Sequence, residues 1–267
     1  MFQTPRPNDA LTETLYTGGF YHSLNEEKFT EAFLGTKRRH VMKQLDWIQE
    51  RAGLSSLPRK RALDIGCGVG ICLDILRGRG WEVQGIESDP QLAAYGNEKF
   101  GLSIRQEFFK DGLFPPEHFT LVYNHHTYEH LANPLELTRW IRKIVAPDAV
   151  LFFAVPTYPW SFHFFSWEWM NVCHNTIFTH KTFSNCLAAA GFEMTDYKYD
   201  PYGEVWVLAR PAAAAKTYPV KWWQVQMELW ASPALFAAGI FHRAVRRLVL
   251  DPRYFFKRLA RVFSKSW

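Results

Sequence analysis

A glycine-rich turn with a carboxylate on each side holds the residues of this chain best suited to chemistry. Gly66, Gly68 and Gly70 stand at every second position after a short apolar run, so the backbone can turn tightly and approach a ligand closely. Asp64 lies just before the turn, and Glu87 ends the next short apolar run. A strand, a glycine turn, a helix, a second strand and a terminal acid form a frame that holds an adenosine-bearing cofactor.

The residue types in the turn distinguish between classes of adenosine cofactor. In a dinucleotide site the third glycine of GxGxxG would fall on Ile71, where a branched side chain opposes close packing of helix and strand. The carboxylate of Asp64 would also repel a pyrophosphate. S-adenosylmethionine carries an ammonium group and a sulfonium and has no phosphate. The turn therefore predicts S-adenosylmethionine as the cofactor rather than a dinucleotide.

Strands and helices alternate from residue 59 onward. Strands are expected at 61–65, 82–86, 102–106, 119–124, 149–155, 192–199 and 204–209. Helices are expected at 70–78, 90–100, 134–145 and 181–190. This alternation predicts an α/β fold with a doubly wound, mostly parallel seven-stranded sheet and helices on both faces. Apolar spacing also predicts one or two helices over 26–52.

Composition divides the chain into three parts. Residues 1–58 are predicted to be an N-terminal arm and helices, 59–210 the cofactor-binding domain with an aromatic insert at 156–180, and 211–267 a Trp-containing helical tail. The whole chain has a net charge of +5, but the tail alone holds ten Lys or Arg and two Asp or Glu. The excess positive charge therefore belongs to the tail and not to the glycine-turn domain.

Several segments together resemble the class I S-adenosylmethionine-dependent methyltransferases. Leu63–Gly70 resembles their motif I, and Glu87 matches the acid that ends their second strand. The segment Glu129–Pro134 resembles an EHLxxP motif, and Ile177–Phe192 resembles a later FT…L…AGF pattern. Both patterns are typical of a subgroup that includes ubiquinone-type O-methyltransferases. The resemblance implies the seven-stranded Rossmann-like methyltransferase fold for residues 60–210.

The resemblance also implies which residues bind the cofactor. In the family, the acid at the end of the second strand binds the ribose hydroxyls, and the residue after it lies beside the adenine. A residue pair after the third strand lies against the adenine amino group and ring. In this sequence the implied cofactor-binding residues are Asp64, Gly66, Cys67, Gly68, Glu87, Ser88, Glu107, Phe108, Asn124 and His125.

Histidines near the end of the fourth predicted strand are candidate catalytic residues. Methyl transfer to a hydroxyl needs alignment of the reacting atoms and removal of a proton, and histidine titrates near neutral pH. His126 is the first choice of general base, followed by His130 and His174. A structural or solvent-facing role for each of them stays open.

Two other interpretations of the histidine cluster are weighed. His126, Glu129 and His130 match the HxxEH pattern of some metalloproteases, but they straddle a loop after a strand instead of lying on one helix. Some small-RNA 2′-O-methyltransferases bind a divalent ion through a similar ExxEH…H set. Here His126 replaces the first Glu, and His174 is the best candidate for the distant His. A structural role for Glu129 and His130 is favoured, so no metal is predicted.

The expected function is S-adenosylmethionine-dependent methylation, most simply at oxygen, of a small hydrophobic or lipid-linked acceptor. Aromatic residues after the fifth strand suit an aromatic or acyl-chain substrate. The alternatives are the metal-dependent RNA enzyme and a non-catalytic cofactor-binding partner protein. The second alternative arises because Thr120 stands where the family commonly has Asp in the fourth strand, and because His126 departs from the family pattern.

Partners and location follow from the tail and the cysteines. Basic and apolar residues interleaved over 216–267 suit peripheral contact with an anionic membrane, or packing on the domain. Nucleic acid is disfavoured because no nucleic-acid module accompanies the charge. The four cysteines lack a regular spacing and the first residues lack an apolar core, which favours the cytoplasm.

Overall fold

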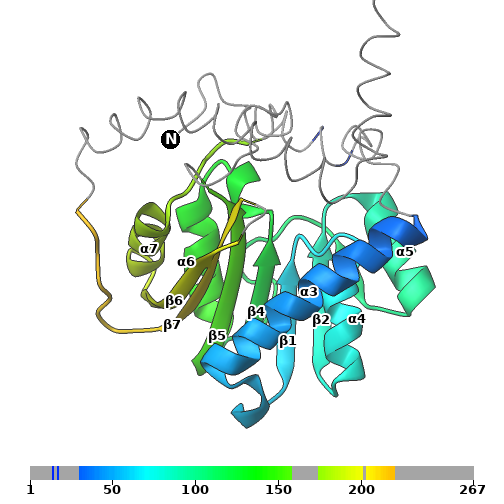
Figure 1. Cartoon of the computed structure of the whole chain (residues 1–267), viewed down its shortest axis with the longest axis horizontal. Helices are drawn as coiled ribbons and strands as arrows, with labels where there is room; N and C mark the ends of the chain where they lie inside the picture. Colours follow the sequence, from blue (N-terminus) through cyan, green and yellow to red (C-terminus); the bar gives the residue numbers. More distant parts are fainter. Residues whose placement is uncertain (1–13, 15–16, 18–29, 158–173, 201–202, 220–267) are drawn as a thin grey trace, which may run out of the picture.

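The computed structural model describes residues 14, 17, 30–157, 174–200 and 203–219, which form a seven-stranded sheet with helices on both faces (Figure 1). The strand order is β3-β2-β1-β4-β5-β7-β6. The predicted seven-stranded sheet is confirmed, and its mostly parallel direction is matched in part: β1 to β5 pair in parallel, whereas β7 is antiparallel to both β5 and β6. The strands are β1 (Arg61–Ile65), β2 (Glu82–Glu87), β3 (Ile104–Gln106), β4 (Phe119–His125), β5 (Val145–Pro156), β6 (Phe192–Tyr199) and β7 (Glu204–Pro211).

Helices cover the two faces of the sheet in separate layers. On one face lie α3 (Glu31–Ala52), α4 (Ile71–Gly78) and α5 (Pro90–Phe100), and on the other lie α6 (Pro134–Ile144) and α7 (His180–Ala188). Successive residues of the buried strands alternate between these layers, as strand geometry requires. Phe152 of β5 packs in the α3 layer and Phe153 in the α6 layer, and both are fully buried.

Side-chain caps fix where the helices begin. The α3 helix begins after Thr30, whose hydroxyl accepts a hydrogen bond from Phe33 N, and it ends at Gly53 in the left-handed conformation. Asp89 and Asn133 cap α5 and α6, and each is followed by a proline in the first turn. These caps explain why the predicted helix starts after Asp89 and Asn133 agree with the structure.

Several element ends differ from the sequence predictions, including those of β5, α7 and β3. Strand β5 begins at Val145 rather than at 149, because Val145 pairs with Phe119 of β4 before a register shift. The predicted helix over 181–190 ends at Ala188, and the predicted strand over 102–106 begins at Ile104. The start of β5 depends on backbone pairing with β4, a contact between distant segments that local propensity does not encode.

The strand order creates a topological switch point between β1 and β4, at the carboxyl ends of these strands. The connections leave β1 toward β2 on one side and approach β4 on the other, and ligands of such sheets bind beyond the carboxyl ends of the strands there. Because β7 is antiparallel, its first residue Glu204 pairs with Pro156 at the end of β5. The start of β7 therefore lies at the same end of the sheet as the carboxyl ends of β1, β2 and β4.

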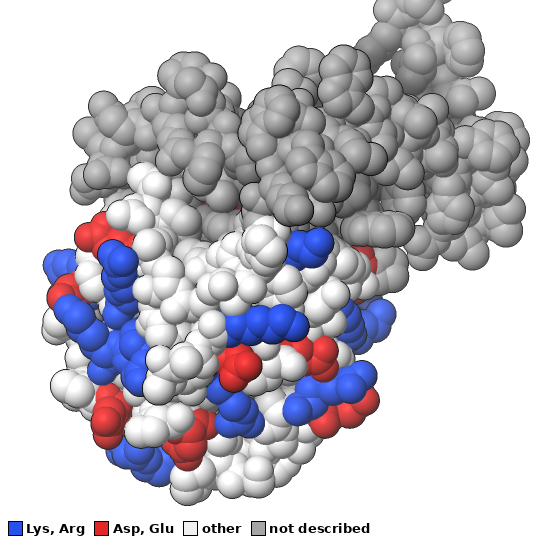
Figure 2. Space-filling model, turned by 90° about the vertical axis from the view of Figure 1, so that its left-hand side faces the viewer, with Lys and Arg blue, Asp and Glu red and all other residues white. Residues whose placement is uncertain are grey.

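Charges on the described part of the protein are mixed. On the face shown in Figure 2, Lys and Arg side chains lie among Asp and Glu side chains. Most of the predicted arm, the aromatic residues 158–173 and residues 220–267 of the tail lie outside the described residues. Among the described helices, none has the length and apolar character needed to cross a membrane.

Candidate active site

The glycine turn after β1 has the backbone geometry that its composition predicts. Gly66, Gly68 and Gly70 have φ values of 71°, 56° and 79°, a region that side chains other than glycine adopt at a cost. A Cβ atom on Gly66 would lie 2.3 Å from Thr127 Oγ1, so the turn packs against the loop after β4. At Gly68 an added Cβ would meet nothing within 4 Å, so this glycine borders open space.

The carboxylate of Glu87 is held at the turn by backbone hydrogen bonds. Gly68 N donates to Oε2 at 2.7 Å, and Asp89 N donates to Oε1 at 2.9 Å. The side chain is 8% exposed. A carboxylate oxygen can accept more than one hydrogen bond, so Glu87 is oriented to bind hydroxyl donors such as those of a ribose.

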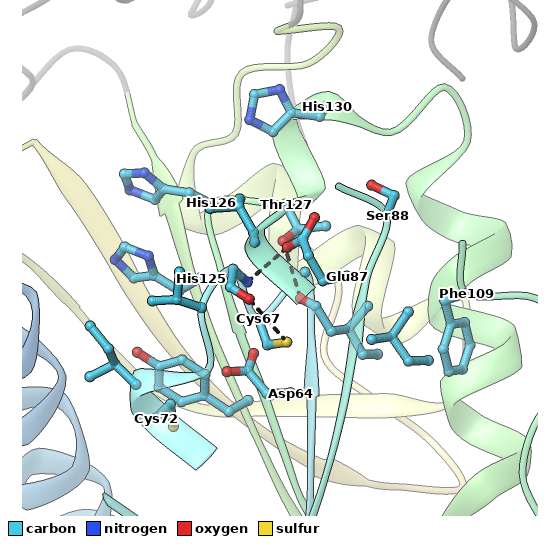
Figure 3. A pocket seen from close by; sticks show the side chains of 18 of the residues that line it. Asp64, Cys67, Cys72, Glu87, Ser88, Phe109, His125, His126, Thr127 and His130 are labelled. Carbon is cyan, nitrogen blue, oxygen red and sulfur yellow. Dashed lines mark hydrogen bonds between the residues drawn. The ribbon is translucent and has the colours of Figure 1, made fainter. Parts of the chain in front are cut away.

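A cavity of about 1240 Å³ opens above the turn (Figure 3). Its volume exceeds the roughly 300–1,000 Å³ of a site for one drug-sized ligand, so there is room for a cofactor and an acceptor together. The predicted residues that line it are Asp64, Gly66, Cys67, Gly68, Glu87, Ser88, Glu107, Phe108, His125, His126 and His130. Sequence analysis missed Lys37, His40, Thr127 and Glu204, which also line it.

Asp64 presents a buried acidic group to this cavity. It is 3% exposed, and burial raises its pKa well above the ordinary value, with Lys37 opposing and Glu87 reinforcing that shift. A cationic ligand group would favour the ionised carboxylate, whereas a phosphate would be repelled. The acidic pair of Asp64 and Glu87, together with the open space at Gly68, fits S-adenosylmethionine.

Two of the predicted cofactor residues lie in a more exposed part of the cavity wall. The Glu107 carboxylate accepts a hydrogen bond from Arg105 Nε at 2.7 Å and lies 3.7 Å from Lys110 Nζ. Phe108 is 40% exposed. Both line the cavity as predicted, and the adjacent Phe109 and Trp140 add apolar surface to the same wall.

Asn124 differs from the expectation of direct cofactor contact. It is fully buried and is not among the residues lining the cavity. Its Nδ2 donates to Ile65 O at 2.7 Å, and Thr127 Oγ1 donates to the same carbonyl at 3.1 Å. The amide thus joins β4 to the end of β1 and supports the glycine turn from beneath. Its position at the end of a strand did not reveal which way its side chain points.

His125 and His126 meet Glu204 at the carboxyl end of β4. The Nε2 atoms of the two histidines lie 3.4 and 3.0 Å from Glu204 Oε1, and their rings stack with centroids 4.2 Å apart. Lys37 Nζ lies 2.6 Å from His125 Nδ1. Burial opposes ionisation of Glu204, but His125 and His126 hold its pKa well below the ordinary value.

A second group forms around Glu129 in η3 (Tyr128–His130). His130 Nε2 lies 3.7 Å from Glu129 Oε1, and the rings of His130 and His174 are 4.7 Å apart. Burial raises the pKa of Glu129 to about 7 and lowers that of His174 to about 4. The structure thus brings Glu129, His130 and His174 together. His174 belongs to this group but does not line the cavity.

The missed residues come from elements outside the motifs. Lys37, His40 and Gln44 stand at helical spacing on α3, where Gln44 is fully buried and contacts both His40 and Tyr123. Polar residues next to the apolar face of that helix were a signal that could have been used. Glu204 stands alone before an apolar strand, and an acid there is also unusual.

Comparison with known proteins bears on this geometry. The sequence model of the family described as "Methyltransferase domain" matches residues 35–197. The chain belongs to this family. It is 33% identical over 121 residues to a ubiquinone biosynthesis O-methyltransferase of Actinobacillus pleuropneumoniae, covering 42% of this chain and 51% of that protein. A protein of the same name from Pseudomonas syringae is 31% identical over 117 residues, covering 42% and 49%. The chain thus spans about half the length of these curated relatives.

Solved structures share the fold of this methyltransferase. A geranyl diphosphate C-methyltransferase of Streptomyces coelicolor, bound to S-adenosyl-L-homocysteine, has a TM-score of 0.55 at 15% identity, covering 64% of this chain and 76% of that one. A methyltransferase of Archaeoglobus fulgidus has a TM-score of 0.54 at 17% identity, covering 71% and 99%. The family and the fit of the residues confirm S-adenosylmethionine as the cofactor.

Proposed function

We propose that this methyltransferase methylates an oxygen of a small, hydrophobic acceptor. The observation that carries the proposal is that one cavity is lined both by the acids of the glycine turn and by the histidines after β4. Cofactor-binding and proton-accepting groups therefore face the same space. The relatives named as ubiquinone biosynthesis O-methyltransferases support oxygen as the site of transfer.

The residues divide the work between the two sides of the cavity. Glu87 would bind the ribose of the cofactor, and Asp64 would bind its ammonium group. Gly68 leaves space for the ribose and the ammonium group because it has no side chain. S-adenosylmethionine supplies an electrophilic methyl group on a sulfonium. His126 would accept the proton of the acceptor hydroxyl as the new oxygen–carbon bond forms, and the apolar wall would align the acceptor.

Cofactor binding is tested by calorimetry with S-adenosylmethionine and S-adenosylhomocysteine. Glu87→Ala removes a buried charged acceptor, a loss of about 1.5–3 kcal/mol, and should weaken binding at least tenfold. The matched control is Glu82→Ala at the opposite end of β2, where the side chain is exposed and pairs with Arg61. Equal binding by both variants, or wild-type binding of NAD instead, would overturn the assignment.

The acceptor class is tested with methyl-labelled S-adenosylmethionine and a panel of phenols. The panel contains phenols without a side chain and phenols with short and long apolar chains. Transfer to oxygen that improves with chain length is the expected result. Methylation of carbon or nitrogen, or equal use of all phenols, would contradict the proposal.

A second candidate is an RNA 2′-O-methyltransferase that uses a metal at the Glu129 group. The ligand atoms of Glu129, His130 and His174 lie within 4.8 Å of one another, and this donor set suits a transition metal. Metal analysis of the purified protein and activity after chelation test it. Full activity of metal-free protein on a small acceptor would remove this candidate.

Membrane contact through residues 216–267 remains a proposal from the sequence. The basic and apolar residues of the tail favour binding to anionic lipid, which would bring the enzyme to a lipid-linked acceptor. Co-sedimentation of the full chain with anionic and with neutral vesicles tests it. Equal binding to both kinds of vesicle would count against the electrostatic part of the proposal.

A further inference from the structure

We propose that Glu204, on β7, is the positioning residue that fixes His126 as the general base. The inference rests on the proposed function and adds a residue from outside the family motifs. Glu204 does not need to touch the substrate. It acts through the tautomer and the orientation of the His126 ring, as the acid does in an acid–histidine–nucleophile arrangement.

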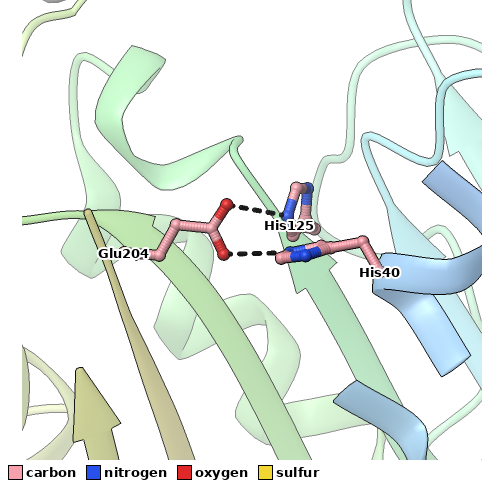
Figure 4. A group of neighbouring side chains, drawn as sticks. All are labelled: His40, His125 and Glu204. Atoms are coloured by element: carbon pink, nitrogen blue, oxygen red, sulfur yellow. Dashed lines mark hydrogen bonds and ion pairs between the residues drawn. The ribbon is translucent and has the colours of Figure 1, made fainter. Parts of the chain in front are cut away.

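Four ring nitrogens converge on the Glu204 carboxylate. Trp206 Nε1 donates to Oε2 at 2.8 Å, and His40 Nε2 lies 3.2 Å from the same oxygen (Figure 4). His126 and His125 approach Oε1 at 3.0 and 3.4 Å. An ionised carboxylate has about four acceptor positions, and the four ring nitrogens surround both of its oxygens. This arrangement favours a hydrogen-bonded centre over a metal site at these residues.

The contact with Glu204 determines which nitrogen of His126 carries the proton. A carboxylate is only an acceptor when it is ionised, so the facing Nε2 must donate its N–H. In the neutral ring Nδ1 is then left unprotonated and is the atom able to take up a proton. When His126 accepts the proton of a hydroxyl, the resulting imidazolium lies 3.0 Å from the negative charge of Glu204.

His125 is held differently, although it is the neighbouring residue. Lys37 Nζ lies 2.6 Å from His125 Nδ1, so both nitrogens of that ring are engaged. Burial, Lys37 and His126 lower the pKa of His125 well below its usual range. Burial also opposes the charged form of His126, yet Glu204 raises its pKa overall. Of the two stacked rings, His126 is the one suited to take up a proton.

The backbone turns His126 away from the buried strand. Its φ of 57° is in the left-handed region, which non-glycine residues adopt at a cost, while its N donates to Ala154 O at 2.9 Å. The side chain is 40% exposed and lines the cavity, whereas that of His125 is 8% exposed. A strained residue that is held by hydrogen bonds at a cavity wall is typical of a functional position.

Titratable groups from four elements surround His126 and influence its protonation. Glu204 of β7 and Glu129 of η3 favour the imidazolium, and Lys37 of α3 disfavours it. His125 of β4 stacks on the ring and stays neutral. Among the described residues, Glu204 is the only one of these groups that forms a hydrogen bond or ion pair with His126, so its removal should have the largest effect.

Side-chain ¹⁵N NMR tests the inference without knowledge of the acceptor. Long-range ¹H–¹⁵N spectra report the tautomer and the titration of each ring, and the spectrum of His126→Gln identifies the signals of His126. The wild type should show Nε2–H at neutral pH. In Glu204→Gln the ring should become a tautomer mixture, and its apparent pKa should fall by about half to one unit. Glu193→Gln, the same change at an exposed position of β6, should alter neither.

The wild-type spectrum alone can overturn the inference, even if Glu204→Gln does not fold. A proton on Nδ1 of His126, or a tautomer mixture in the wild type, contradicts it. An unchanged tautomer and titration in folded Glu204→Gln also contradicts it. If no acceptor is ever methylated while His126 shows the expected tautomer, the proposed function fails and the positioning by Glu204 stands.

Kinetics adds a second test once an acceptor is in hand. Glu204→Gln should lower kcat by about 10- to 100-fold with little change in KM, and move the acidic limb of the pH profile to lower pH. Glu204→Asp, which keeps the charge, should recover part of the loss. Because both residues act as a unit, His126→Gln combined with Glu204→Gln should be no slower than His126→Gln alone. Multiplied losses in the double variant would contradict the inference.

Discussion

Glu204 and Glu129 are two buried carboxylates that the fold treats in opposite ways. Glu204 is 6% exposed and is approached by four ring nitrogens, and its pKa is held well below the ordinary value. Glu129 is 1% exposed, and neither of its oxygens has a hydrogen-bond partner among the described residues. Burial raises its pKa to about 7.

The comparison shows that burial alone does not decide whether a carboxylate is charged. Desolvation disfavours the charged form of both groups, but only Glu204 receives enough donors to offset it. Glu204 is thus suited to a fixed negative charge that orients histidines. Glu129 can change its protonation near neutral pH, or accept a cation.

The largest expected difference is in the free energy of unfolding when each carboxylate side chain is replaced. Glu204→Ala leaves Trp206, His125 and His126 without the buried carboxylate that they share, so the free energy of unfolding should fall by about 3–5 kcal/mol. Glu129→Gln removes a carboxylate that accepts no hydrogen bond from the described residues, and it should change stability by less than about 1 kcal/mol at pH 5. Urea unfolding of the three proteins measures both. Equal losses would show that donors do not distinguish the two sites.

The second difference is in pH dependence. The unfolded chain releases the Glu129 proton near pH 4.5, whereas the folded protein retains it to about pH 7. This group therefore lowers stability as pH rises over that window, by about 3 kcal/mol. Glu204 behaves in the opposite way, since its folded pKa is depressed: its contribution is present above about pH 4.5 and is lost as pH falls through the folded value.

Unfolding measured from pH 4 to 8 separates these contributions. The stability gain of Glu129→Gln over wild type should grow between about pH 4.5 and 7. The loss in Glu204→Gln should shrink on acidification. If the difference between Glu129→Gln and wild type does not vary with pH, Glu129 is ionised in the folded protein and the contrast between the two carboxylates fails.

The smallest effect concerns one donor of the Glu204 group. Trp206→Phe keeps an aromatic ring against Trp47 and Phe152 but removes the N–H that bonds Oε2. Stability should fall by about 1.5–3 kcal/mol, and the pKa of Glu204 should rise because a hydrogen bond to its charged form is lost. Tyr128→Phe, in the other core layer, is a control that removes a buried hydroxyl bonded to Thr138 and leaves the Glu204 contacts in place. A pKa of Glu204 that stays unchanged in Trp206→Phe would show that the other donors suffice.

Sequence reasoning identified the cofactor half of the site better than the acceptor half. The glycine turn and Glu87 are close in the chain, and their spacing determines their geometry, so their positions in the cavity wall were predictable. Asn124 was placed correctly at the end of β4, but its side chain points to Ile65 O and not into the cavity. Strand position constrains a side chain to one of two faces, and the contacts made there depend on neighbouring strands.

By itself, the sequence determined the order of strands and helices, the cofactor turn and the acids that accompany it, because these depend on local spacing and helix caps. Only the tertiary structure decided that Glu204 meets His126. The two residues come from β7 and β4, which are far apart in the chain and separated by β5 in the sheet. The antiparallel direction of β7 brings its first residue to the end of the sheet where β4 ends, and that long-range pairing places the acid among the ring nitrogens that stabilise its charge.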